Sequence, residues 1–270
     1  MNFRVDVIVV GDSKSGHEIL DKVASSKSTL QVAFISQAFK STTTHDYINV
    51  KYFRDEVLYV SYRQRLFCCY MKNGDHIYST HIVIASGLTY EPLVVNSEPI
   101  PCVFNNAEEV LKNAKDQPAL VLCNKDSDVK LALEIAKKYK QVYLCTKELE
   151  LTKKVSSATA KKLDKAENIA VLPNTSISNA ISKDGVLQKV ELDNYSTVNC
   201  SAIYAKTNAK PATEYLPKKL IQRDTLGYLV VSDKCESTLV PKCYAAGNCL
   251  PKYTKAMEQS LVEAIINDFN

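Results

Sequence analysis

Short apolar runs with an amphipathic segment between them open the chain. Residues 5–10 and 30–35 predict buried strands, and the segment between them predicts a helix over about 16–26. Parallel pairing of two such strands requires a crossover helix, so the pattern predicts a βαβ unit. Extended segments follow and are predicted over 57–62, 65–71 and 76–86. Asn73-Gly74 between the last two predicts a hairpin.

The same order of elements repeats after the prolines near residue 100. Strands are predicted over 119–123, 141–145, 169–173 and 200–206, and helices over 127–139 and about 155–165. A hairpin joined by Asp184-Gly185 is predicted over 176–182 and 186–192. A last segment predicts strands over 227–231 and 242–247 and a helix over about 255–268. Two βαβ units of one plan, each with a β meander, predict a duplicated α/β architecture.

Composition excludes several classes of protein. With 46% hydrophobic and 24% charged residues, the chain has the balance of a soluble globular protein, and its longest apolar runs are far too short to span a membrane. The N-terminus has no secretory pattern, so we expect a cytoplasmic protein. The net charge of +4 comes without a Lys/Arg cluster interleaved with aromatic residues, so we expect no nucleic-acid partner.

Nine cysteines in such a chain predict reduced thiols rather than a disulfide framework. None of them forms a C-x-x-C pair, and the four histidines show no metal-ligand spacing with them. We therefore expect no metal site.

Glycine is scarce and is confined to turns. The chain has seven glycines, whereas average usage predicts about 19. Gly11 and Gly16 frame the turn GDSKSG after the first strand, Gly87 follows the strand HIVIAS, and Gly247 lies at the end of the last strand, in CYAAGN. The first turn resembles a dinucleotide fingerprint in which Ser13 replaces the second glycine.

Three stretches resemble the low-molecular-weight thioredoxin reductases, flavoproteins with two dinucleotide-binding domains. DVIVVGDSKSG (6–16) resembles the family's FAD turn, THIVIASGLTYEPL (80–93) resembles the strand and turn that close its first half, and VPKCYAAGNC (240–249) resembles its second FAD motif. The resemblance implies two Rossmann-like βαβ domains with β meanders. An FAD-type domain of residues 1–102 and 211–270 is interrupted by an NAD(P)-type domain of residues 103–210. It also implies a homodimer.

The chain departs from the family at two sites that electron transfer in the family requires, the redox cysteine pair and the second nucleotide turn. Only Cys102 lies where the family carries Cys-x-x-Cys, and one thiol cannot make the intramolecular exchange. In the second nucleotide turn, Cys123, Asn124 and Lys125 stand in the glycine positions, where side chains crowd a pyrophosphate. Lys147 alone stands where arginines would grip the 2′-phosphate of NADPH. We therefore expect neither thioredoxin reductase turnover nor NADPH binding.

The FAD-type site keeps more of its pattern. Ser36 ends the second strand where an acidic residue would hold the ribose, and Asn248 replaces the expected aspartate of the last motif. Gly87 lies 51 positions after Ser36, a shorter stretch than the family carries there, so the resemblance implies that the wall covering the flavin is shortened. The candidate cofactor-binding residues are Gly11, Ser13, Gly16, Ser36, Gly87, Gly247 and Asn248.

Two functions from different classes remain open. One is a flavin-dependent oxidoreductase that keeps FAD and receives electrons from a donor other than NADPH. The other is a pseudoenzyme that binds no cofactor and acts by binding a protein partner or by forming a homodimer. No catalytic residue is assigned. Cys102 and Cys249 lie in predicted loops near the flavin site, so the reactivity of both thiols should be tested, although core packing is the expected role of Cys249.

Overall fold

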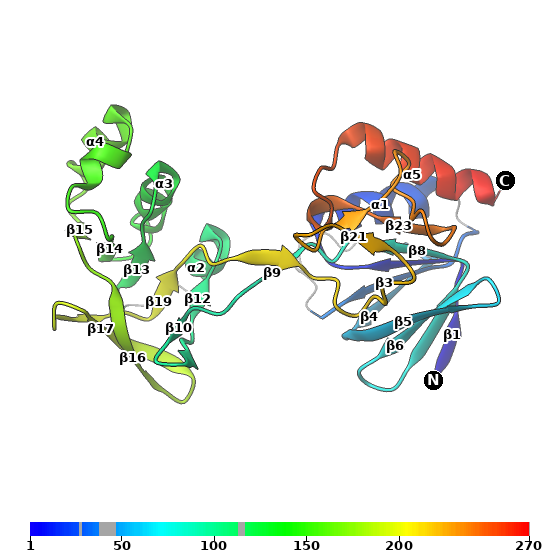
Figure 1. Ribbon diagram of the computed structural model, residues 1–270, viewed down its shortest axis with the longest axis horizontal. Coiled ribbons are helices and arrows are strands. Elements are labelled where there is room, and N and C mark those ends of the chain that lie inside the picture. The colour runs from blue at the N-terminus through cyan, green and yellow to red at the C-terminus, as the bar shows by residue number, and fades with distance from the viewer. Residues whose placement is uncertain (27–28, 38–46, 113–116, 270) are drawn as a thin grey trace. The chain divides into compact units, whose positions relative to one another are not determined.

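The computed structural model describes residues 1–26, 29–37, 47–112 and 117–269. The chain divides into two compact units, which are described separately. Unit 1 comprises Met1–Thr89 and Ala209–Asn270, and unit 2 comprises Tyr90–Asn208 (Figure 1). The strand β9 (Leu88–Tyr90) pairs with β20 (Ala209–Pro211) where the chain leaves unit 1 and returns to it.

Unit 1 is built on a five-stranded parallel sheet in the order β23-β8-β2-β3-β4. Its strands are β2 (Val7–Val10), β3 (Val32–Ser36), β4 (Val50–Arg54), β8 (His81–Ile84) and β23 (Cys243–Ala245). Every residue of β2, β8 and β23 is buried. These three strands therefore read as continuous apolar runs, as strands covered on both faces do.

Two layers cover the parallel sheet of unit 1. The helices α1 (Lys14–Ser26) and α5 (Lys255–Asp268) lie on one face, and a second sheet of order β1-β7-β6-β5 lies on the other (Figure 1). That sheet comprises β1 (Asn2–Arg4), β5 (Val57–Arg63), β6 (Leu66–Met71) and β7 (His76–Ser79). The short pair β21 (Gln222–Arg223) and β22 (Leu229–Val230) and the 3-10 helix η2 (Gly247–Cys249) complete the unit.

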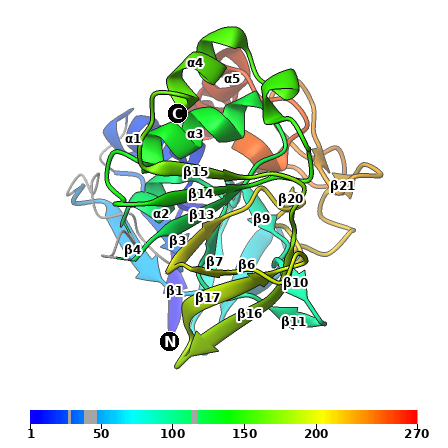
Figure 2. The same ribbon diagram turned by 90° about the vertical axis from the view of Figure 1, so that its left-hand side faces the viewer.

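Unit 2 repeats this plan. Its parallel sheet has the order β12-β19-β13-β14-β15, with the helices on one face and an antiparallel sheet β16-β17-β18 on the other (Figure 2). The strands of the parallel sheet are β12 (Val103–Phe104), β13 (Ala119–Leu122), β14 (Val142–Cys145), β15 (Ile169–Leu172) and β19 (Ala202–Tyr204). The helices are α2 (Ala107–Lys112), α3 (Asp126–Ile135), α4 (Ser157–Leu163) and the 3-10 helix η1 (Leu151–Lys154).

The meander of unit 2 comprises β16 (Ile177–Lys183), β17 (Val186–Leu192) and β18 (Thr197–Asn199). A two-stranded hairpin of β10 (Val94–Val95) and β11 (Glu98–Pro99) lies near β16. Two apolar clusters fill the two faces of the parallel sheet: Val121 belongs to the helix side and Leu120 to the meander side. Alternation along one strand thus supplies both cores.

The two units share one strand topology. In each, three parallel strands follow one another outward, a meander comes next, and the chain then returns to a strand beside the first one: β8 beside β2 in unit 1, and β19 beside β13 in unit 2. The predicted duplicated α/β architecture is therefore confirmed. The hairpin at Asn73-Gly74 is also confirmed, because β6 and β7 pair antiparallel across it.

Several predicted bounds were wrong. The run 76–86 is not one strand: it divides at Thr80 into β7 and β8, which belong to different sheets. The helix expected over 127–139 ends at Ile135, and single turns continue to Tyr139, whose hydroxyl donates to the Val110 carbonyl oxygen.

The boundary expected at 102/103 also differs from the division of the units at 89/90. Residues such as Leu93, Val95 and Ile100 pack into the core between the parallel sheet and meander of unit 2. The apolar side chains of 90–102 therefore bring this segment into unit 2.

Candidate functional site

Three turns of unit 1 meet at the carboxyl edge of its parallel sheet. Gly11 follows β2, Ser86 and Gly87 follow β8, and Gly247 follows β23. Backbone hydrogen bonds tie these turns to neighbouring strands, since the Gly11 amide donates to the Ile35 oxygen at 2.9 Å and the Ala246 amide donates to the Ile84 oxygen at 2.8 Å. After β2 the chain continues into β3, which pairs with one edge of β2, while β8 pairs with its other edge. This is the topological switch point at which open α/β sheets bind ligands.

Gly11 and Gly16 are required by the protein's own backbone. A Cβ on Gly11, whose φ is +114°, would lie 2.3 Å from the Ala85 carbonyl oxygen, and a Cβ on Gly16 would lie 2.3 Å from the Gly11 carbonyl oxygen. Contacts this short do not occur in real structures, so both positions admit only glycine. The two glycines of the fingerprint therefore hold the strand-to-helix turn together whether or not a cofactor binds.

The other two candidate glycines differ from each other. Gly247 has a φ of +75°, and a Cβ there would lie 2.9 Å from Ser15 Oγ and 3.9 Å from Ser13 Oγ. The last motif thus lies directly against the first turn. Gly87 has a φ of +68°, is buried, and would place a Cβ in open space, with no described atom within 4 Å. A side chain at Gly87 would therefore meet no described atom within 4 Å, unlike one at Gly11 or Gly16.

Polar side chains occupy the first turn. Ser13 Oγ accepts a hydrogen bond from the Gly16 amide at 3.1 Å, so this hydroxyl caps α1. The Asp12 carboxylate pairs with His17 Nε2, and both side chains are largely buried, with 8% and 16% exposed. His17 Nδ1 is buried and has no partner among the described residues. The turn therefore carries its own carboxylate, an arrangement that the glycine spacing did not reveal.

Ser36 and Asn248 lie at the same edge. Ser36 is the last residue of β3, and its carbonyl oxygen accepts from the Asp55 amide at 3.0 Å. Asn248 lies in η2 with an exposed side chain. Strand order therefore brings all seven candidate residues to the carboxyl ends of β2, β3, β8 and β23.

The corresponding turn of unit 2 is closed by a buried carboxylate. Asp128, on the first turn of α3, is 2% exposed and accepts hydrogen bonds from the Asn124 amide at 3.0 Å and from the Lys125 amide at 3.2 Å. Asp126 lies beside it and pairs with Lys130 at 2.6 Å. The ion pair with Lys130 and a hydrogen bond from the Ser156 amide lower the pKa of Asp126, which holds a second negative charge at this turn.

The Asp128 carboxylate is the acceptor for two backbone amides of this turn. The backbone amides of such a turn are the donors that a pyrophosphate would use, and here a side chain of the same chain uses two of them. The sequence analysis singled out residues 123–125 at this turn but missed Asp128. An acidic residue three positions after the helix cap is the signal that could have revealed it. Lys147, the remaining candidate for a 2′-phosphate, is exposed.

The two candidate thiols differ in exposure. Cys249 was expected in a loop, but it lies in η2, is fully buried, and donates its Sγ hydrogen to the Ala246 oxygen at 3.1 Å. Burial raises the pKa of Cys249 to about 12, which agrees with core packing as the role of this thiol. Cys102 is partly exposed, has a φ of +59°, and belongs to unit 2. The other eight cysteines are buried, and all nine are free thiols.

Other kinds of site were also sought. No group of three or more histidine, cysteine or acidic side chains within 1–26, 29–37, 47–112 and 117–269 converges as a metal ion would require. Among the helices of those residues, none is long and apolar enough to cross a membrane.

Comparisons with known proteins agree with this topology. In the crystal structure of T. acidophilum thioredoxin reductase, the match covers 98% of this chain and 99% of that one, with a TM-score of 0.72 and 16% identity. Lactococcus lactis thioredoxin reductase matches with a TM-score of 0.71 and 15% identity over 98% of both chains. The enzyme from Streptococcus pyogenes MGAS5005 matches with a TM-score of 0.59 and 17% identity over 100% of both. At these identities the likeness establishes the fold alone.

A search of curated proteins finds no match. A family model described as pyridine nucleotide-disulphide oxidoreductase matches residues 22–247, which is most of the chain. Together with the two parallel sheets, their meanders and the turns at their carboxyl edges, this match shows that the chain belongs to the pyridine nucleotide-disulphide oxidoreductase family.

Proposed function

We propose that the protein is a thioredoxin reductase-like member of its family that does not carry electrons from NADPH to a disulfide. The observation that carries this proposal is the Asp128 carboxylate, which accepts hydrogen bonds from the Asn124 and Lys125 amides. A phosphate about 4 Å from this carboxylate would be repelled by about 4 kcal/mol at an effective dielectric constant near 20. That energy corresponds to an affinity roughly a thousandfold lower. The residues of unit 2 therefore do not fit NADPH.

The thiols support the same proposal. Transfer of two electrons from a flavin to a disulfide within one chain needs two neighbouring accessible cysteines. Cys102 stands alone in its stretch of sequence, and the remaining thiols are buried. Burial raises the pKa of Cys69, Cys200 and Cys249, so these thiols stay protonated at neutral pH.

Unit 1 is proposed as the FAD-type domain. The buried Gly87 faces open space at the switch point of the sheet, which supports a ligand at this edge. Gly11, Gly16, Gly87 and Gly247 would shape the site, Ser13 and Asn248 would offer polar atoms to the cofactor, and Ser36 would lie near its ribose. Bound there, FAD would supply two-electron redox chemistry. Its electron donor would differ from NADPH bound at the second turn.

A cofactor-free scaffold is the second candidate function, and the Asp12–His17 pair favours it. This buried carboxylate lies at the amino end of α1, where a pyrophosphate would bind. The Ser13 hydroxyl already occupies the Gly16 amide. On this proposal both turns are kept for folding, and the protein acts by binding a partner protein or a second copy of itself.

An absorption spectrum of the purified protein, followed by titration with FAD, separates the two candidates. Visible absorption by oxidised flavin would support a flavoprotein. Ser13→Asp should then abolish it, because aspartate caps a helix as well as serine but adds a negative charge to the turn. Ser25→Asp, at the exposed carboxyl end of the same helix, is the matched control. A colourless protein that ignores FAD would support the scaffold. Rapid bleaching of bound flavin by NADPH would refute the main proposal.

A further inference from the structure

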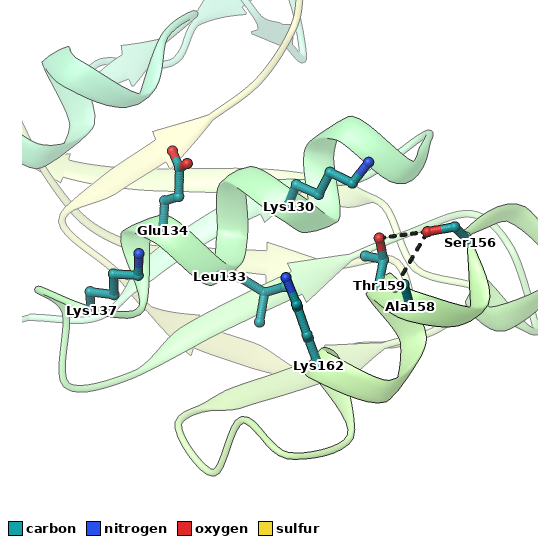
Figure 3. Close-up of a pocket in the computed structure, with 8 residues that line it drawn as sticks. All are labelled: Lys130, Leu133, Glu134, Lys137, Ser156, Ala158, Thr159 and Lys162. Atoms are coloured by element: carbon teal, nitrogen blue, oxygen red, sulfur yellow. Dashed lines mark hydrogen bonds between the residues drawn. The ribbon is translucent and has the colours of Figure 1, made fainter.

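A basic groove lies between α3 and α4 of unit 2. It encloses about 520 Å³, which is within the range of ligand sites. One wall is formed by residues of α3 and the turn that follows it, from Lys130 to Lys137. The other wall is formed by residues of α4. The residues that matter below are Lys130, Leu133, Glu134, Lys137, Thr159 and Lys162 (Figure 3).

The two walls leave positive charges without partners. Lys137 and Lys162 are exposed, and neither forms an ion pair with any residue that the structure describes, whereas Lys130 pairs with Asp126. Half-buried Leu133 gives the groove an apolar floor. Figure 3 shows Lys162 extending from α4 toward Leu133, while the Glu134 carboxylate points away from Lys162. The groove therefore combines an apolar contact with two free ammonium groups.

The stretch of sequence that forms the groove is more basic than the rest of the chain. Residues 125–165, which include α3 and α4, contain eleven lysines and six acidic residues, a net charge of +5. The whole chain carries +4, so the remaining 229 residues carry a net charge of −1. A basic segment of this kind attracts anionic partners by long-range electrostatics.

We propose that this groove binds an acidic segment of a partner protein. An apolar side chain of the segment contacts Leu133, and carboxylates on either side of it pair with Lys137 and Lys162. The groove residues explain why a peptide suits the site better than other anions. None of the lining residues is aromatic, so bases have nothing to stack on. The hydroxyls of Ser156 and Thr159 bond to each other at 2.8 Å and are not directed at a phosphate.

This inference depends on the surface of unit 2 alone and holds whether or not unit 1 binds FAD. The test is fluorescence anisotropy at low salt with a fluorescein-labelled peptide of repeated Glu-Glu-Leu units. We expect saturable binding that weakens at least about tenfold, or 1.4 kcal/mol, in the double variant Lys137→Glu/Lys162→Glu. Replacing the leucines of the peptide by glutamine should also weaken it. The matched control is Lys218→Glu/Lys219→Glu, a pair of exposed lysines in unit 1 that should leave the affinity unchanged.

Three results would overturn the proposal. The first is no binding of the peptide, and the second is an equal loss of affinity in the unit 1 control, which would indicate attraction to net charge alone. The third is tighter binding of a labelled oligonucleotide of the same charge that the groove variant abolishes, which would assign the groove to nucleic acid. Far-UV circular dichroism of each variant confirms that these exposed substitutions leave the fold intact.

Discussion

Replacing Gly16 by alanine tests whether packing of the first turn alone requires glycine. The new Cβ would lie 2.3 Å from the Gly11 carbonyl oxygen and 3.3 Å from Ala85 Cβ, where ordinary contacts begin at 3.4 Å. The closer neighbour is backbone, so a side-chain rotation cannot relieve the clash. Overpacking of this kind costs about 3 kcal/mol. Unit 1 has 151 residues, and for that size the loss corresponds to a melting temperature lower by about 6–12 °C.

The assay is thermal unfolding followed by circular dichroism, without added cofactor. Hydrogen exchange measured by mass spectrometry assigns the destabilised segment, which should include α1 and β8. Gly74→Ala is the control in the same unit, since Gly74 has a φ of +86° but a Cβ there would meet nothing within 4 Å. The backbone conformation alone should cost about 1–2 kcal/mol there. If Gly16→Ala destabilised unit 1 less than Gly74→Ala, the turn would not be held by its own packing.

Three further predictions follow from other sites. Asp128→Ala should destabilise unit 2 by about 1–2 kcal/mol, because the Asn124 and Lys125 amides lose their acceptor. Urea unfolding measures this loss of stability, and an unchanged unfolding midpoint would contradict the prediction. Unit 1 should lose stability as the pH falls below 6.5, the ordinary pKa of histidine. Burial lowers the pKa of His81, so the folded state binds this proton less readily than the unfolded chain does. Unfolding midpoints measured between pH 7 and 5 should slope less in His81→Gln. Iodoacetamide should label one thiol of the native protein, and Cys102→Ser should abolish the labelling, since the other eight cysteines are buried; labelling of two or more would refute the assigned burial.

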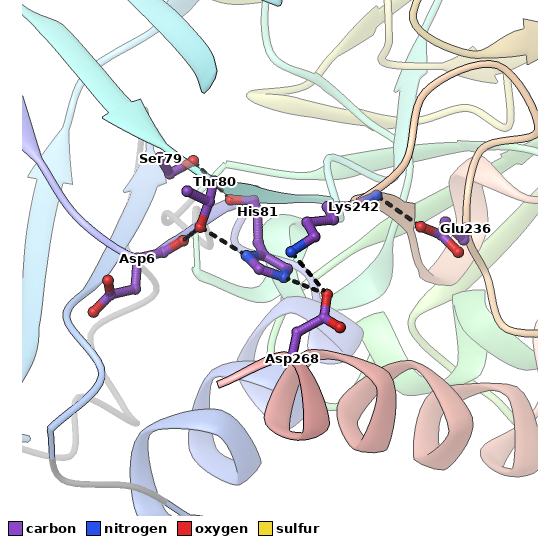
Figure 4. A network of polar contacts seen from close by, with 7 residues as sticks. All are labelled: Asp6, Ser79, Thr80, His81, Glu236, Lys242 and Asp268. Carbon is purple, nitrogen blue, oxygen red and sulfur yellow. Dashed lines mark hydrogen bonds and ion pairs between the residues drawn. The ribbon is translucent and has the colours of Figure 1, made fainter. Parts of the chain in front are cut away.

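The His81 prediction rests on a network at the amino edge of the parallel sheet, opposite the candidate site. His81 Nε2 contacts Asp268 Oδ2 at 3.0 Å, and its Nδ1 contacts Thr80 Oγ1 at 2.9 Å (Figure 4). Lys242 Nζ also pairs with Asp268, at 3.2 Å. The hydrogen bond to Asp268 raises the pKa of His81, but burial outweighs it. The pKa of Asp268 is lowered by His81 and Lys242 despite its partial burial, so its contribution to stability is lost only at more acidic pH.

Hydrophobic periodicity predicted the duplicated fold because buried parallel strands and amphipathic helices leave direct patterns in the sequence. The strands predicted this way over 5–10 and 30–35 correspond to β2 (Val7–Val10) and β3 (Val32–Ser36). The hairpin between β6 and β7 was predicted from the Asn73-Gly74 dipeptide. Strand ends were harder to predict. Residues 76–86 contain no glycine or proline to mark the point, at Thr80, where the chain passes from one sheet to the other.

The strand-to-helix turn at Gly11 was predicted from the sequence, but the side-chain contacts within it were not. The glycine spacing located the turn at Gly11, yet the same spacing serves backbone packing as well as a pyrophosphate, so it could not decide between them. The Asp12–His17 pair and the Asp128 cap depend on how side chains turn within each loop. A linear pattern of residue types does not specify that geometry.

Binding of NADPH tests the central claim most directly, because the claim rests on a carboxylate that already occupies the second nucleotide turn. Isothermal titration of the full chain with NADPH, up to about 1 mM, covers the range of ordinary Michaelis constants. The account predicts no saturable binding. Saturable binding with a micromolar dissociation constant, lost on charge reversal of Lys147, would show that the turn accepts a pyrophosphate despite Asp128 and would contradict the account.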